Sequence, residues 1–211
     1  MKFALAQINS TTSVPENLDK VRTFAREAAE AGARFVVFPE ATMSAFGSGL
    51  RGIAEENTES WRSALAELAA ELDLIIVVGE FAVTGDRVIN LLAAYTPEGE
   101  RFDYAKIHLY DAFGFKESDT VEPGAEPVVI SIDGEDIGLA LCYDIRFPKL
   151  FAELSRRGAR LAVVAAAWGA GPGKVEQWEI LARARALDSN MFVAALGQAD
   201  PEVSGVEVPK K

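Results

Sequence analysis

The chain has 211 residues, 49% of them hydrophobic, so it can bury one sizeable core. Its formal net charge of −11 repels phosphate backbones and anionic lipid head groups. No stretch approaches the roughly 20 apolar residues of a membrane-spanning helix, so we expect neither nucleic acid nor a membrane as a partner. A single cysteine cannot form an internal disulfide, which is typical of the cytoplasm. One cysteine and one histidine are too few soft ligands for a metal site, and no cluster of carboxylates suggests the remaining option, Mg²⁺. We therefore expect no metal and no cofactor.

The first part of the chain alternates apolar runs with amphipathic stretches. The apolar runs predict strands at residues 3–8, 34–38 and 74–80. Ser13 with Glu16 three residues later resembles a capping box, so a helix is expected to begin there and to end at Gly32. A second helix is predicted over residues 60–72, where Trp61 and three leucines recur at helical spacing.

The middle of the chain favours antiparallel hairpins, and the last part returns to alternating helices and strands. Turn residues separate the predicted strands 88–95 and 101–106, and Asp133-Gly134 separates 128–132 from 137–142. Helices are then expected at 148–157 and 175–187, and strands at 161–166 and 191–196. This order is typical of an α/β protein with inserted hairpins, which we interpret as one domain over residues 1–211.

Three reactive side chains follow predicted strands, at the positions where α/β proteins tend to build their sites. Glu40 follows the strand at 34–38, Lys106 ends the strand that begins near Arg101, and Cys142 ends the strand at 137–142. Each is unremarkable alone, since a lone cysteine after an apolar strand is usually an inert buried thiol. Together they supply a nucleophile, a carboxylate to take its proton and a cation for a developing oxyanion.

The single histidine, His108, offers a weaker alternative. It lies two residues after Lys106, so both side chains would point to the same face of a strand. A cysteine–histidine arrangement would depend on this one residue. A supporting role beside the site, or simply a hydrogen-bonded structural role, is the more usual interpretation.

Three ordered segments of the chain resemble the nitrilase superfamily of carbon–nitrogen hydrolases. They are residues 38–41 (Phe-Pro-Glu-Ala), 104–109 (Tyr-Ala-Lys-Ile-His-Leu) and 141–148 (Leu-Cys-Tyr-Asp-Ile-Arg-Phe-Pro). The order and wide spacing of glutamate, lysine and cysteine fit that family's triad. Further matches lie at residues 4–7, 117–119 and 183–186, so the resemblance extends over nearly the whole chain.

This resemblance implies a fold and a chemistry. The fold is a four-layer αββα sandwich, usually paired into dimers or larger assemblies. The chemistry is hydrolysis of a non-peptide carbon–nitrogen bond in a small molecule through a thioester. Glu40 would be the general base, Lys106 would stabilise the tetrahedral intermediate, and Cys142 would be the nucleophile. The backbone N–H of Tyr143 would be a second oxyanion donor, and Glu117 would help to position substrate and water.

The segment after the cysteine resembles the amidase branch that contains ω-amidases and deaminated-glutathione amidases. Arg146 could bind a substrate carboxylate, or it could form an internal salt bridge with Asp144 or another acid. Trp168 could line the pocket or serve packing alone. Hydrolysis of N-carbamoyl compounds is the nearest competing activity. A catalytically defective fragment is a further alternative. A flavodoxin-like nucleotide-binding protein fits less well, because the glycines at 169–173 lack phosphate-loop spacing.

The end of the chain departs from the family pattern. The last predicted strand ends at residue 196, and the sequence stops at Lys211, whereas family members usually continue with further strands. We therefore expect a sandwich that lacks its last strands and exposes unpaired sheet edges. A homodimer or larger assembly is expected for a chain with a complete C-terminus.

Overall fold

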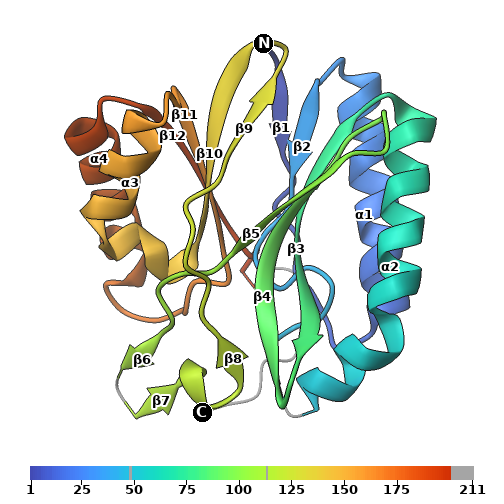
Figure 1. Cartoon of the computed structure of the whole chain (residues 1–211), viewed down its shortest axis with the longest axis horizontal. Helices are drawn as coiled ribbons and strands as arrows, with labels where there is room; N and C mark the ends of the chain where they lie inside the picture. Colours follow the sequence, from blue (N-terminus) through green and yellow to red (C-terminus); the bar gives the residue numbers. More distant parts are fainter. Residues whose placement is uncertain (48, 113, 201–211) are drawn as a thin grey trace.

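The structure is a computed structural model that describes residues 1–47, 49–112 and 114–200. The described residues form four layers, in which two sheets pack face to face and a pair of helices covers the outer face of each sheet (Figure 1). One pair is α1 (Val14–Glu30) and α2 (Leu50–Leu72), and the other is α3 (Pro148–Arg156) and α4 (Lys174–Ser189). The expected αββα sandwich is confirmed.

The first sheet has six strands and mixes parallel with antiparallel pairing. Its order is β1 (Phe3–Leu5), β2 (Phe35–Val37), β3 (Ile75–Thr84), β4 (Arg87–Tyr95) and β5 (Arg101–Ala105). The first three strands run parallel to one another, β4 is antiparallel to both β3 and β5, and the short β8 (Val121–Glu122) pairs with β4.

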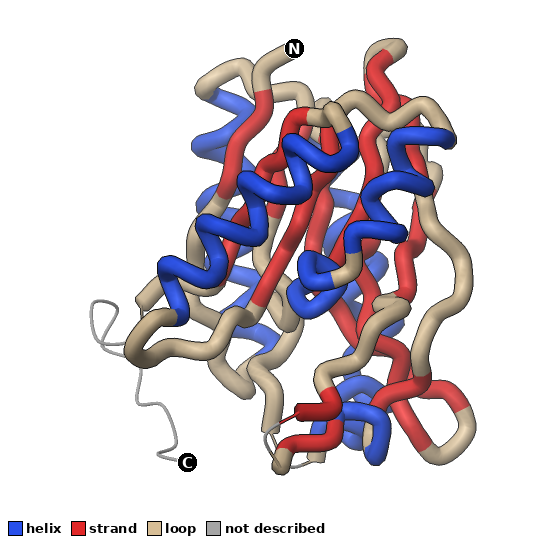
Figure 2. Tube along the Cα trace, turned by 90° about the vertical axis from the view of Figure 1, so that its left-hand side faces the viewer, coloured by secondary structure: helices blue, strands red, loops and turns tan. Residues whose placement is uncertain are grey.

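The second sheet has four strands, in the order β12 (Phe192–Gly197), β11 (Leu161–Ala166), β10 (Glu135–Leu141) and β9 (Val129–Ile132). The first three are parallel, and β9 forms the predicted antiparallel hairpin with β10. Figure 2 shows α3 and α4 lying across the outer face of this sheet. A separate two-stranded sheet pairs β6 (Asp111–Ala112) with β7 (Phe115–Lys116).

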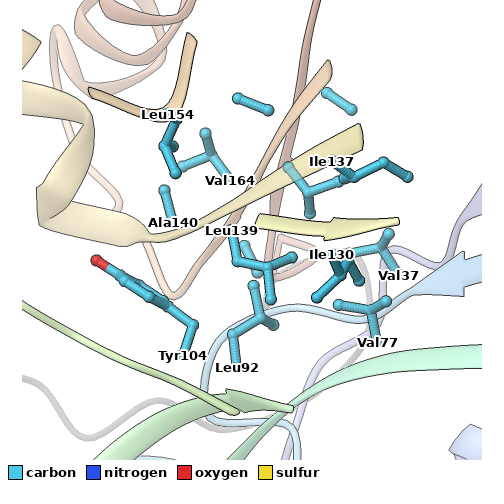
Figure 3. Packing of buried hydrophobic residues seen from close by; sticks show 14 of the residues in the cluster. Val37, Val77, Leu92, Tyr104, Ile130, Ile137, Leu139, Ala140, Leu154 and Val164 are labelled. Carbon is cyan, nitrogen blue, oxygen red and sulfur yellow. The ribbon is translucent and has the colours of Figure 1, made fainter. Parts of the chain in front are cut away.

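Apolar side chains fill the spaces between these layers in two main clusters. Between the sheets, Leu92 of β4 faces Leu139 of β10, and both are fully buried (Figure 3). Between the first sheet and its helices, Trp61 and Leu65 of α2 pack near Val36 of β2. Both faces of the strands are therefore buried, which explains why the strands read as continuous apolar runs.

Several expected boundaries are corrected by the structure. The Ser13 side chain accepts a hydrogen bond from the Glu16 backbone N–H at 3.5 Å, as the capping pattern predicts. However, β1 ends at Leu5, and α2 begins at Leu50, ten residues before the expected start. The first turns of α2 carry few apolar residues, but Leu50 and Ala54 pack against Phe81 in a small third cluster. Tertiary packing thus extends a helix whose local pattern is weak.

The hairpin between β3 and β4 is a further correction. We expected the strand at 74–80 to stop there, yet β3 continues to Thr84 and pairs with β4 across a turn at Gly85, which has a φ of +53°.

Within the described ranges, no helix is both long enough and apolar enough to cross a membrane.

Candidate active site

Two of the three predicted reactive residues are in direct contact, and a third carboxylate joins them. The Lys106 ammonium lies 2.9 Å from Oε1 of Glu40 and 3.0 Å from both carboxylate oxygens of Glu117. All three side chains are almost fully buried. Burial of two carboxylates and one ammonium is costly unless they satisfy one another, so this cluster fixes the positions of its members.

Besides Lys106, two donors from other parts of the two sheets hold the Glu40 carboxylate. It follows β2 through Pro39, and Asn90 of β4 donates its side-chain N–H to Oε1 at 2.8 Å. The backbone N–H of Ala167, just after β11, donates to Oε2 at 2.8 Å. The next residue, Ala41, has a φ of +59°, so the chain turns sharply immediately after Glu40.

Glu117 is positioned by a short 3₁₀ turn, Glu117–Asp119, and contacts the Lys106 ammonium. Its Oε2 atom accepts a hydrogen bond from the Tyr110 backbone N–H at 2.6 Å. Asn90 lies 3.5 Å from Oε1, so this one amide contacts both carboxylates. The resemblance to the family predicted Glu117 near the triad, and the structure places it against Lys106.

Cys142 occupies a strained turn at the end of β10. It is the first residue of the 3₁₀ turn Cys142–Arg146 and has a φ of +45°, the left-handed region that L-residues other than glycine rarely adopt. Such strain is typical of functional positions and persists only where the surroundings enforce it. The residue as a whole is half-buried. Tyr143 follows it directly and is also half-buried.

Burial and the neighbouring charges together determine the protonation of the Cys142 thiol. Burial raises the pKa of the Cys142 thiol well above its usual value, and the negative charge of Glu40 raises it further, while Lys106 opposes the shift. Burial would also raise the pKa of Glu40, but the charge and hydrogen bond of Lys106 and the Ala167 N–H outweigh it and hold that pKa below its usual value. At neutral pH the site therefore combines a thiol with an ionised carboxylate.

Lys106 stays protonated for a related reason. Burial alone would lower the pKa of Lys106, but the neighbouring charges of Glu40, Cys142 and Glu117 raise it above its ordinary value. A permanent cation beside the thiol can stabilise an oxyanion, and the ionised Glu40 can accept the thiol proton. Within the described ranges, no group of three histidine, cysteine, aspartate or glutamate side chains could hold a metal ion.

The structure places the other predicted residues around this centre. His108 does not join the triad, because its Nδ1 lies 2.7 Å from Asp144. In the part of the chain that the structure describes, Arg146 forms no salt bridge with Asp144. It is exposed, donates to the Gln177 side chain at 3.0 Å and lies over the Trp168 ring, 6.0 Å from its centroid. The Trp168 indole N–H donates to the Lys174 carbonyl at 3.0 Å, and its ring packs against Trp178.

Sequence reasoning missed several residues that hold the site. Asn90 is one, and the structure shows it fully buried. An asparagine inside the apolar run of β4 is the signal in the sequence that could have identified it. Gln198, just after β12, is another: its side chain donates to the Glu40 carbonyl at 2.9 Å and accepts from the Ser10 N–H at 2.8 Å. No local pattern marks Gln198, because its partners are distant in the sequence.

A cysteine thiol, an ionised carboxylate and a buried ammonium are the groups that cysteine attack on an amide-like bond requires. The chain belongs to the carbon–nitrogen hydrolase family, whose model matches residues 2–207. It is a hydrolase of carbon–nitrogen bonds other than peptide bonds, an amidase of the nitrilase superfamily that uses a cysteine nucleophile.

Known proteins with different degrees of sequence identity to this chain support this assignment. The chain is 56% identical over 205 residues to the protein named Hydrolase Rv0480c of Mycobacterium tuberculosis, covering 95% of this chain and 73% of that protein. It is 30% identical over 211 residues to Omega-amidase NIT2 of Danio rerio, covering 96% and 76%. A cysteine-to-alanine mutant of the Nesterenkonia AN1 amidase matches with a TM-score of 0.84 at 28% identity, covering 95% and 77%. Another structure of that amidase shows acrylamide added at its active-site cysteine.

Proposed function

We propose that Glu40, Lys106 and Cys142 form the catalytic triad with which this protein hydrolyses a small amide through a thioester. The observation that carries the proposal is the position of the Lys106 ammonium, 2.9 Å from Glu40 and 3.0 Å from Glu117 and close enough to Cys142 for its charge to act on the thiol. Cys142 is the only cysteine in the chain, so it is the residue available as nucleophile.

The first half of the reaction forms the acyl-enzyme. The Cys142 sulfur attacks the amide carbonyl carbon as Glu40 accepts the thiol proton. The Lys106 ammonium and the Tyr143 backbone N–H stabilise the oxyanion of the tetrahedral intermediate. The intermediate collapses as the carbon–nitrogen bond breaks, and Glu40 passes the proton to the leaving nitrogen, which departs as ammonia. The acyl group remains on sulfur as a thioester.

The second half returns the enzyme to its starting state. Glu40 accepts a proton from water, and the resulting hydroxide attacks the thioester carbon. Lys106 again stabilises the oxyanion, and Glu117 holds Lys106 and helps to position the water. Collapse of the intermediate breaks the carbon–sulfur bond, releases a carboxylic acid and restores the Cys142 thiol as Glu40 returns the proton.

The substrate we propose carries a carboxylate as well as the amide. Arg146 lies four residues after Cys142 and is exposed. Its hydrogen bond goes to the neutral Gln177 amide, and no acid among the described residues pairs with it, so its guanidinium is available to an anion. The relative named omega-amidase supports the same choice. An N-carbamoyl compound is the alternative substrate, and its hydrolysis would give the free amine, carbon dioxide and ammonia.

The triad is tested by measuring ammonia release from ω-amides, neutral amides and carbamoyl amino acids, with mass spectrometry of the intact protein. Cys142→Ala should abolish turnover without unfolding, and Lys106→Ala should lower kcat about 10²–10³-fold, as loss of an oxyanion-hole donor typically does. Lys149→Ala is the matched control, because Lys149 is exposed and should leave the rate unchanged. Full activity in Glu40→Gln would refute the general-base role. A lack of both ammonia and a Cys142 adduct would mean that this chain is catalytically defective.

The substrate class has its own test. Arg146→Gln should raise KM for carboxylate-bearing amides about tenfold or more and leave KM for neutral amides unchanged, because only the former lose a charge-assisted pair. Arg183→Gln, an exposed arginine of α4, provides the control. An equal change in KM for both kinds of amide would rule out carboxylate recognition by Arg146.

A further inference from the structure

Asp144 is a fully buried carboxylate with hydrogen-bond donors on both of its oxygens. Oδ1 accepts the His108 backbone N–H at 3.0 Å and contacts His108 Nδ1 at 2.7 Å. Oδ2 accepts the Tyr104 hydroxyl at 2.6 Å and the Leu141 backbone N–H at 2.9 Å. A buried anion with this many donors is stable where it lies and resists displacement.

The donors come from the two chain segments that carry the reactive groups. Tyr104 and His108 lie on either side of Lys106 in the sequence, at the end of β5 and in the loop after it. Leu141 directly precedes Cys142, and Asp144 follows it by two residues. These segments belong to different sheets, and Tyr104 lies between the sheets (Figure 3). The Asp144 carboxylate therefore joins the backbone that carries Lys106 to the backbone that carries Cys142.

A second contact holds the same two segments. The His108 ring stacks on the Phe147 ring, with centroids 3.7 Å apart and planes 9° from parallel. Phe147 ends the turn that begins at Cys142. The strained φ of Cys142, +45°, lies inside the segment that Leu141, Asp144 and Phe147 hold from both sides.

We propose that Asp144 is a positioning residue for the reaction, which sets the geometry between the Lys106 ammonium and the Cys142 sulfur by tying their two segments together. It acts through Tyr104, His108 and Leu141 and need not touch the substrate. The inference rests on the proposed roles of Lys106 and Cys142. A misplacement of about 1 Å between reacting groups can cost about 10²-fold in rate, so this link contributes to kcat rather than to substrate binding.

The most direct variant is Asp144→Asn, which removes the charge and keeps the shape. Each oxygen of Asp144 accepts one backbone N–H, from His108 or from Leu141. Whichever way the new amide turns, its NH₂ group must face one of these donors, and a backbone N–H cannot reverse its role. We expect kcat to fall about 10²-fold with KM little changed.

A milder pair of variants separates positioning from stability. Tyr104→Phe removes the 2.6 Å bond to Asp144, and Tyr95→Phe removes a 2.5 Å bond from another buried tyrosine to the buried Glu80, on the helix side of the sheet. Both should lower the melting temperature by a similar amount. Only Tyr104→Phe should lower kcat, by about 3–10-fold, because Tyr95 holds neither segment of the site.

The readouts are kcat and KM for an amide substrate and the rate of iodoacetamide addition at fixed pH. The chain has one cysteine, so every thiol adduct lies on Cys142. Peptide mass spectrometry separates this adduct from adducts at other side chains and follows the site without a known substrate. We expect both kcat and the alkylation rate to fall in Tyr104→Phe and to stay at the wild-type value in Tyr95→Phe. Equal rates in wild type and Tyr104→Phe would overturn it, even if Asp144→Asn fails to fold. A wild type that neither releases ammonia from any amide nor forms an adduct at Cys142 would instead overturn the proposed triad.

Discussion

Two buried glutamates show how environment decides the behaviour of a single residue type. Burial by itself would raise the pKa of both Glu40 and Glu80. At Glu40 the adjacent Lys106 outweighs burial and the net pKa is low, whereas at Glu80 burial prevails over the hydrogen bond from Tyr95 and the charges of Arg101 and Arg62. Only Glu40 is therefore kept ready to accept a proton near neutral pH.

The lowered pKa of Glu40 predicts the acid limb of the pH profile. The base form is lost only as pH falls through the lowered pKa, so kcat/KM should stay level down to the ordinary carboxyl value of 4.5 and fall below it. The stability that the ion pair between Glu40 and Lys106 contributes depends on pH in the same direction. It is fully present above the unfolded-state pKa of Glu40 and is lost as pH falls through the folded-state pKa. At the basic end, the raised pKa of Lys106 keeps the pair intact past the ordinary lysine value of 10.5.

A pH–rate profile, with urea unfolding measured over the same range, checks this expectation. The Glu80→Gln variant is the control for a buried carboxylate outside the site. An acid limb centred near pH 6 would contradict the lowered pKa of Glu40.

At the scale of elements, one strand leaves room for the turn that carries Glu40. Gly79 of β3 lies against this turn, and a Cβ built there would be 2.5 Å from the Pro39 carbonyl oxygen and 2.6 Å from the Ala41 nitrogen. These are backbone atoms, which cannot move away by a side-chain rotation. On β10, a Cβ at Gly138 would instead meet the Leu154 side chain, its nearest atom 2.9 Å away. The two strands thus differ in what opposes a larger residue.

We therefore expect Gly79→Ala to lower kcat about 10-fold or more, since it must shift the Glu40 turn. Gly138→Ala should cost stability of about 1–3 kcal/mol by overpacking and leave kcat per folded molecule nearly unchanged. Steady-state kinetics and thermal melts of both variants separate the effects. A loss of kcat in Gly138→Ala as large as that in Gly79→Ala would contradict this distinction.

At the scale of the whole molecule, the packing between the two sheets brings the site together. Glu40 and Lys106 come from the first sheet, whereas Cys142 follows a strand of the second. The apolar cluster between the sheets, which includes the fully buried Leu139, sets how far apart these sheets lie. Stability of this core and assembly of the site should therefore be linked.

Leu139→Ala tests this link. Loss of a fully buried leucine from a close-packed core should lower the free energy of unfolding by about 2–5 kcal/mol. Leu187→Ala, at a residue of α4 that is 83% exposed, should change it by less than about 0.5 kcal/mol. Urea unfolding followed by circular dichroism measures both, and equal losses would contradict a core between the sheets.

Much of this fold could be predicted from local patterns. The strand at residues 161–166 is found with exactly the expected bounds, and the two predicted hairpins form. The start of α2 and the pairing of β3 with β4 were not foreseen, because each depends on packing or pairing partners far along the chain. The expectation of missing outer strands concerns the chain after β12, which includes residues 201–211, outside the described residues.

The sequence by itself determined the alternation of strands and helices and the order of Glu40, Lys106 and Cys142 at three strand ends, because these follow from periodicity and side-chain chemistry. Only the tertiary structure decided that Glu40 and Lys106 touch, that Asn90 holds Glu40, and that Asp144 joins the segments of Lys106 and Cys142. The physical reason is that hydrogen bonds and pKa values depend on neighbours in space, and these neighbours come from distant segments on two different sheets.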